Sequence, residues 1–429
     1  MTSSAASHRQ PSASRLTKIA YTLVLLAYWA LLYTTSLSED VERGSVLYAL
    51  YLGPVLLFAA LFTIPTLFKR AVTLPIALLI SYAAIVIAVA LARGDFPTVS
   101  STLIMTLLLI VISSERLTPP LALLNWLFLA SIPASLITYL AGNNIYGILP
   151  GMSLDEALWW RISLFPAVPE SAFFSAVVVL ANLSCRGLPM RRTCILLASY
   201  FLLFAGLRSA LIGTLMALAY MVAVRRGWLR EPGAIMLWLL GAAVTFVASL
   251  LLIDLLTVVP EFNSEFLNTY LFRSKEGLGS VDDLTKSIYR TWLWSEHFRI
   301  AATSPWVGIG TNDFALLADT SLKMPVGSGS ESFLTGLYAR VGLPALLLLG
   351  FFVATVKSQV RGGRVLPPAI SLLLFVAMLA YGSFLVPYNF AFLVMLGLLC
   401  GHAPQTAVCP RIPIRSSVWR LRAKSRGRT

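Results

Sequence analysis

The chain has 429 residues, of which 58% are hydrophobic and only 12% are charged, and its formal net charge is +14. Soluble domains carry about 25% charged residues, so this composition excludes a soluble globular enzyme, a disordered chain and a fibrous protein. The apolar runs are continuous and do not alternate with polar residues. They argue against an outer-membrane barrel and predict an all-α polytopic membrane protein.

Residues 1–17 form a polar, basic leader without a nearby cleavage signal, so we expect the first helix to be retained. A helix needs about 20 apolar residues to cross a bilayer. Windows of this kind predict about twelve spans, near 18–37, 45–68, 71–92, 98–114, 119–141, 169–185, 193–207, 209–224, 233–258, 332–356, 366–385 and 387–401. Together they make a single transmembrane domain over 18–401, which a basic tail over 402–429 follows.

The basic residues predict the orientation of these spans. With the N-terminus in the cytoplasm and alternating spans, cytoplasmic segments hold 22 of the 33 lysines and arginines. The positive-inside rule then places both termini in the cytoplasm. The tail over 402–429 is interpreted as a topology anchor on anionic lipid. Nucleic-acid binding is the weaker interpretation, because Trp419 is the tail's only aromatic residue.

Two long loops lie on the opposite, periplasmic side in this topology. The loop over 142–168 contains Trp159, Trp160 and Arg161. The loop over 259–331 has 6 basic and 9 acidic residues together with several aromatic ones, which favours an ordered segment. Within it, the stretch from Thr285 to Thr303 is the best candidate for a helix. Loops of this length are commonly functional.

Arg208 is the first charged residue that the pattern places inside the membrane. It lies in an apolar stretch of 31 residues that has arginine pairs at both ends. Both ends should therefore be cytoplasmic, so the chain must turn near Gly206. Arg208 would then lie at the apex of a shallow hairpin, at the floor of an outward-facing aqueous cavity. The alternative is an arginine that extends to the outer headgroups. Intramembrane charges are costly and by default functional.

Arg340 and Glu331 belong to the next charged group. Arg340 is expected about two turns into a span that begins near Ser332, and Glu331 stands at the mouth of that span. Acidic residues at such positions are also common helix caps, so a capping role for Glu331 stays open.

The third group lies between residues 286 and 314. If this segment is helical, Arg290, Trp294 and His297 share one face, and Arg299 lies on another. With Arg208 and Arg340, these residues would give an outward cluster of cations. Guanidinium groups suit phosphate oxygens, so the residues predict an enzyme or carrier for an anionic, lipid-linked substrate at the outer leaflet.

Motifs for other chemistry are missing from the sequence. It contains no GxxxxGK[ST], no GxGxxG after a strand and no HExxH. The three histidines are too scattered for a histidine-based metal site. We therefore expect no cofactor and no metal ion.

Three segments give the chain a family resemblance. GLRSALIGTLMALAY, YRTWLWSEHFRIAATSPWVGIGTNDF and ESFLTGLYARVGLPALLLL resemble segments of the O-antigen ligase and Wzy polysaccharide polymerase superfamily. In the second segment, the spacing between Arg299 and Gly310 is similar to an Arg-x10-Gly pattern of the polymerases. The resemblance covers roughly residues 160–400.

The resemblance implies a GT-C-like, metal-independent, inverting glycosyltransferase of the bacterial inner membrane, with its active site on the periplasmic face. The donor would be an undecaprenyl-diphosphate-linked oligosaccharide. By position, Arg208 and Arg290 would bind the donor diphosphate and stabilise the leaving group. Arg340, Arg299 and Arg161 are further candidates for substrate binding. Membrane lipids are expected partners, and a chain-length regulator stays open as another.

One position departs from the family pattern. Ligases usually have a histidine where this chain has Glu331. A glutamate can still act as general base toward a sugar hydroxyl, and His297 is the alternative base. The substitution favours a polymerase that makes O-antigen of lipopolysaccharide, capsule or exopolysaccharide. A ligase that transfers the glycan to lipid A core is the first alternative, and a transporter or flippase is the second.

Overall fold

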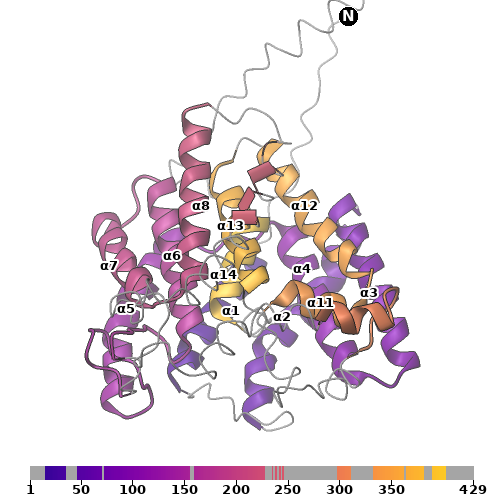
Figure 1. The fold of residues 1–429 in the computed structure, drawn as a ribbon, viewed down its shortest axis with the longest axis horizontal. Coiled ribbons are helices and arrows are strands. Elements are labelled where there is room, and N and C mark those ends of the chain that lie inside the picture. Colours follow the sequence, from indigo (N-terminus) through magenta and orange to yellow (C-terminus); the bar gives the residue numbers. More distant parts are fainter. Residues whose placement is uncertain are drawn as a thin grey trace, which may run out of the picture.

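The computed structural model describes residues 15–34, 46–69, 72–154, 159–227, 297–310, 332–361, 364–380 and 389–401, with isolated helical residues between 234 and 245. The regular structure of this part is helical, and it contains no β-strand (Figure 1). The predicted all-α class is confirmed to that extent.

The described helices follow the predicted apolar windows closely, while most of the window predicted over 233–258 lies outside the described residues. Five of them are long and apolar enough to cross a membrane, and five more are shorter apolar helices, so the protein is membrane-embedded. The twelve-span topology stays a prediction. The helices are α1 (Arg15–Thr34), α2 (Val46–Lys69), α3 (Leu74–Ala92), α4 (Phe96–Glu115), α5 (Leu121–Leu140), α6 (Val168–Ser184), α7 (Arg191–Phe204), α8 (Arg208–Arg225), α11 (Phe333–Val341), α12 (Ala345–Arg361), α13 (Leu366–Ala380) and α14 (Phe390–Cys400).

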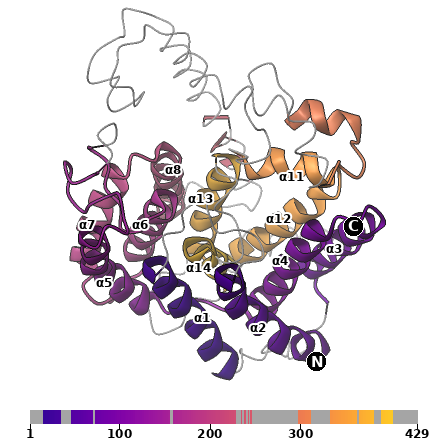
Figure 2. The same ribbon diagram turned by 90° about the horizontal axis from the view of Figure 1, so that it is seen from below.

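The centre of the bundle is formed by α6 and α14. Every residue of α14 is buried, and so is nearly every residue of α6. A helix that is apolar on all sides belongs in such a position. The other helices surround this pair, with α8 against α13, α7 against α6, and α3 against α4 and α12 (Figure 2). The rings of Phe174 and Phe390 join the central helices, with centroids 4.9 Å apart.

Arginine side chains cap several helix ends at one end of the bundle, which we call the capped end. Arg225 Nη2 donates to Leu183 O at 2.7 Å, and Arg191 Nε donates to Asn182 O at 2.6 Å. Arg364 Nη1 donates to Gly401 O at 3.1 Å. Cations stabilise the carbonyl ends of helices, so these contacts fix the last turns of α6 and α14.

A pair of buried asparagines joins α5 to α6 near the capped end. Asn125 Nδ2 donates to Asn182 Oδ1 at 2.9 Å, and Asn182 Nδ2 donates to Asn125 Oδ1 at 2.7 Å. Both side chains are almost completely buried. A buried amide without a partner is costly, so the pair fixes how α5 and α6 pack.

We expect Asn182→Leu to lower the free energy of unfolding by about 1–2 kcal/mol, because it leaves Asn125 Oδ1 without its donor. The measurement is thermal unfolding in detergent. Asn125→Leu/Asn182→Leu is the matched control, and it should recover part of the loss because neither amide is then left behind. A double variant less stable than both single variants would contradict this account.

One predicted span is divided in the structure. The window over 332–356 forms two helices, α11 and α12, with a break at Gly342–Pro344. Gly342 has φ +68°, a conformation that ends a helix, and Pro344 disfavours continuation in the residue before it. Arg340 therefore lies about two turns after the helix start, as predicted, but in the last turn of the short helix α11 and not inside a continuous span.

Candidate functional site

The hairpin predicted around Arg208 is present. Helix α7 ends at Phe204 and α8 begins at Arg208, and Gly206 makes the turn with φ +64°. The segment from Trp159 to Phe165 covers this turn, since Ile162 N donates to Phe204 O at 3.1 Å. A Cβ atom on Gly206 would lie 2.3 Å from the Trp160 ring, so only glycine fits there.

Arg161 is buried beside the hairpin turn, with only 8% of its surface exposed. Its Nη2 donates to Gly206 O at 3.5 Å, and its guanidinium carbon lies 5.8 Å from the centre of the Trp160 ring. Its Nε has no hydrogen-bond partner, and no acidic side chain pairs with Arg161 in the part of the chain that the structure describes. Burying an uncompensated charge is strongly unfavourable. A bound anion would offset that cost.

The N-terminus of α8 adds further donors beside Arg161. The N–H groups of its first turn have no acceptor within the helix, and the helix dipole makes this end positive. Arg208 is half-buried at the first position, and Ser209 is buried directly after it. We call Arg161, Arg208, Ser209 and the N-terminal turn of α8 the hairpin cluster. Its chemistry suits the oxygens of a phosphate.

The glycine-rich segment over 304–310 packs backbone to backbone on the end of α11. Ile309 N donates to Ala339 O at 3.0 Å, and Gly310 N donates to Arg340 O at 2.9 Å. Gly308 has φ +63°, and a Cβ on it would lie 2.2 Å from Arg340 O. The glycines quoted for the family resemblance therefore have a physical role, because they allow this close approach.

The turn between α3 and α4 holds the same segment from its other side. Arg93 Nη1 donates to Gly308 O at 2.8 Å. Asp95 caps α4, since its Oδ1 accepts from Thr98 N at 3.2 Å and its Oδ2 accepts from Thr98 Oγ1 at 2.7 Å. Asp95 Oδ2 also lies close to Gly310, because a Cβ there would be 2.8 Å from it.

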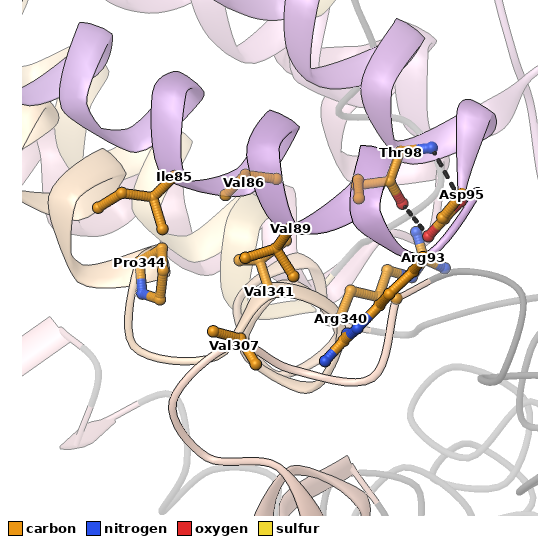
Figure 3. A pocket seen from close by; sticks show the side chains of 12 residues that line it. Ile85, Val86, Val89, Arg93, Asp95, Thr98, Val307, Arg340, Val341 and Pro344 are labelled. Atoms are coloured by element: carbon orange, nitrogen blue, oxygen red, sulfur yellow. Dashed lines mark hydrogen bonds between the residues drawn. The ribbon is translucent and has the colours of Figure 1, made fainter.

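These contacts border a shallow, partly open pocket between the α3–α4 turn and the α11–α12 break, which we call the α3–α11 pocket (Figure 3). Its polar side chains include Arg93, Asp95 and Arg340, and most of the remaining wall is apolar. In Figure 3 the side chains of Arg93 and Arg340 are both drawn at the edge of the pocket, near the α3–α4 turn.

His297 is placed inside the bundle and not at an open site. It is fully buried at the start of the helical segment over 297–303, and its Nδ1 lies 2.8 Å from Thr335 Oγ1 on α11. The N-cap of α11 is Ser332, whose Oγ accepts from Thr335 N at 3.4 Å. The capping role considered for Glu331 therefore falls to Ser332.

The predicted site residues thus divide into separate groups. Arg208 and Arg161 share the hairpin cluster, and Arg340 lies in the α3–α11 pocket. Arg299 is exposed on the segment over 297–303, which bears out the described part of the predicted helix there. In Figure 2, α13 lies between α8 and α11, and it contacts both helices. The predicted residues that fall outside the described part of the chain are Glu331, Arg290 and Trp294.

Arg93 and Asp95 are polar residues of the site that sequence reasoning missed. They lie in the short turn ARGDFP between two apolar windows. The signal was a helix end at Gly94 followed by an Asp cap and a proline, which marks a tight and well-defined turn. Their contact with Gly308 joins residues more than 200 positions apart, which no local pattern reveals.

No protein-family model matches this chain, and no curated protein matches it significantly.

Proposed function

We propose that this protein polymerises undecaprenyl-diphosphate-linked oligosaccharide repeat units into O-antigen, capsule or exopolysaccharide. The observation that supports this most directly is Arg161, a buried cation without an acidic partner among the described residues, which lies beside the turn before Arg208. Such a site at the end of an apolar bundle suits the diphosphate of a membrane lipid. The protein would then be a GT-C-like glycosyltransferase of the Wzy type that needs no metal ion.

The proposed reaction is an inverting displacement at the anomeric carbon of the donor. The hydroxyl oxygen of the acceptor sugar forms a bond to this carbon while the bond to the diphosphate oxygen breaks. The hairpin cluster, with Arg290, would stabilise the charge that develops on the leaving diphosphate. Glu331 would accept the hydroxyl proton as general base. Its rival His297 is fully buried and lies against Thr335, which favours Glu331.

The arginines support an orientation for this reaction. At the capped end, arginine side chains bind the C-termini of helices. The positive-inside rule assigns an arginine-rich end of this kind to the cytoplasm. The hairpin cluster and the α3–α11 pocket lie at the other end of their helices, which would face the periplasm. Both termini would then be cytoplasmic, in the inner membrane of a bacterium.

A carrier for the same lipid-linked glycan is the second candidate. The break between α11 and α12 and the turn between α7 and α8 interrupt helices inside the apolar bundle. Transporters commonly place their substrate sites at such interruptions. A carrier would move the glycolipid without changing its length, so the two functions differ in their products.

Purified protein with a lipid-diphosphate-linked repeat unit as its only glycan tests the proposal. We expect a ladder of lengthened glycans on a gel. Glycan transfer only after lipid A core is added would favour a ligase. Glycolipid movement across a proteoliposome membrane without any new glycosidic bond would favour the carrier. Either of these results would contradict polymerisation.

A further inference from the structure

We propose that the α3–α11 pocket is a second lipid-phosphate site, separate from the hairpin cluster, and that it holds the diphosphate end of the acceptor glycolipid. The residues of the pocket themselves favour a lipid phosphate. The assignment to the acceptor rests on the proposed function, because a polymerase joins two lipid-diphosphate-linked glycans.

The charge of the pocket favours an anion. Two guanidinium groups, of Arg93 and Arg340, line it together with one carboxylate, of Asp95. Both oxygens of that carboxylate already accept hydrogen bonds from Thr98. Among the described residues that line the pocket, two positive charges thus stand against one negative charge. Each guanidinium group provides several donors in fixed directions, which matches the oxygens of a phosphate or diphosphate.

The remaining wall of the pocket favours a lipid over a free anion. Ile85, Val86 and Val89 of α3 lie on one side, and Val341 and Pro344 lie on the other (Figure 3). Ile85 is also exposed on the outside of the bundle. The pocket thus joins a cationic edge to an apolar, lipid-facing surface. An anionic head group with an attached hydrocarbon chain fits both parts, whereas inorganic phosphate fits only the first.

The pocket is preformed by backbone contacts. Gly310 N donates to Arg340 O, and Leu343 N donates to Pro305 O at 3.0 Å. Arg93 holds the same segment through Gly308 O at 2.8 Å. These contacts hold the Arg93 side chain and the Arg340 backbone to one framework, which lowers the cost of ordering the pocket when a ligand binds.

The position of the pocket fits an acceptor site. Arg340 is the last-turn arginine of α11, and Ser332 caps the first turn of that helix, directly after Glu331 in the chain. Figure 2 places α13 between α11 and the α7–α8 hairpin. Donor and acceptor diphosphates would therefore bind on different helices on either side of α13.

The number of lipid phosphates bound per chain tests the proposal. We would measure binding of geranylgeranyl diphosphate to the full chain in detergent by native mass spectrometry. Wild-type protein should bind two molecules, and Arg93→Gln/Arg340→Gln should bind one, with at least tenfold weaker affinity at the lost site. Arg192→Gln is the matched control, because it removes an exposed arginine at the capped end. Two undiminished sites in the double variant would overturn the proposal.

A second variant guards against misfolding. Val86→Phe fills the pocket while both arginines and the Arg93–Gly308 contact stay in place, and it should also reduce binding to one molecule. Unchanged binding in a folded Val86→Phe protein would count against the pocket.

Inorganic diphosphate and geranylgeraniol should each compete poorly with geranylgeranyl diphosphate. Equal competition by phosphatidylglycerol would show a site for ordinary phospholipid and would overturn the assignment to the acceptor.

The two proposals can fail separately. If wild-type protein binds two lipid diphosphates and forms no glycan ladder, polymerisation is wrong and the second site stands. If a ladder forms and Arg93→Gln/Arg340→Gln leaves the KM for the acceptor unchanged, the second site is wrong and polymerisation stands. The expected result is an acceptor KM at least tenfold higher, with a smaller change in kcat.

Discussion

Replacing Arg208 with glutamine should lower the rate of chain extension by about 100- to 1,000-fold, the usual loss when one donor to a developing oxyanion is removed. The reason is its place at the first position of α8, two residues after Gly206, whose carbonyl oxygen accepts a hydrogen bond from the buried Arg161. Glutamine keeps an amide donor on a shorter side chain and loses the positive charge. The measurement is the initial rate of ladder formation at saturating acceptor. The loss should fall mainly on kcat, because the leaving group gains charge in the transition state.

A control variant and a double variant test whether the loss is specific to Arg208 and whether Arg208 acts together with Arg161. Arg192→Gln removes an equally basic residue of α7 at the capped end and should leave the rate within about twofold of wild type. Arg161→Gln should also be strongly impaired, and the double variant should lose much less than the product of the single losses, because both groups act on one anion. Independent, multiplicative losses would show that Arg161 and Arg208 do not share a ligand.

Replacing Gly308 with alanine should strongly destabilise the end of the bundle that holds the α3–α11 pocket. A left-handed backbone costs a residue with a Cβ about 1–2 kcal/mol. At Gly308 the new Cβ would also lie 2.2 Å from Arg340 O and 2.4 Å from Val341 N. Both are backbone atoms and cannot rotate away, so overpacking adds about 1–3 kcal/mol. The measurement is the thermal unfolding midpoint in detergent.

Gly94→Ala provides the matched control for Gly308. Gly94 has φ +70°, close to the value at Gly308, but a Cβ there would meet no atom within 4 Å. Gly94→Ala should therefore lower the free energy of unfolding only by the cost of the left-handed backbone conformation. The difference in stability between the two variants gives the cost of pushing the segment over 304–310 away from α11. Equal losses in stability would show that this close backbone contact contributes nothing.

The sequence predicted helices and their turns better than it predicted contacts between them. Apolar windows located α3 to α6 within a few residues, because length and hydropathy alone determine such segments. The α7–α8 hairpin followed from charge, since basic residues at both ends of one window require an even number of crossings. The break at Gly342 was missed, although Gly-Leu-Pro is a common helix-ending sequence, because the surrounding window stayed apolar.

The candidate site was predictable only in part. Arg208 and Arg340 could be found because a charge within an apolar window is conspicuous. Arg93 lies in a turn, where a charged residue attracts no notice, and its role depends on a hydrogen bond to Gly308. The burial of Arg161 depends on Trp160 and on the shape of the Gly206 turn. Such properties belong to the tertiary structure and have no local signature.

The length of α11 would determine which hydroxyl group of the acceptor glycan can react. Its nine residues form a rigid rod, and eight residue steps separate Ser332 from Arg340, a rise of about 12 Å. A diphosphate held at Arg340 would then be a fixed distance from Ser332, the residue that follows the proposed proton acceptor in the chain. The reactive hydroxyl must bridge that distance, so the sugar attached directly to the phosphate would be too close to react. The enzyme would therefore select repeat units by the distance from their phosphate to the reactive hydroxyl, as well as by the identity of their sugars.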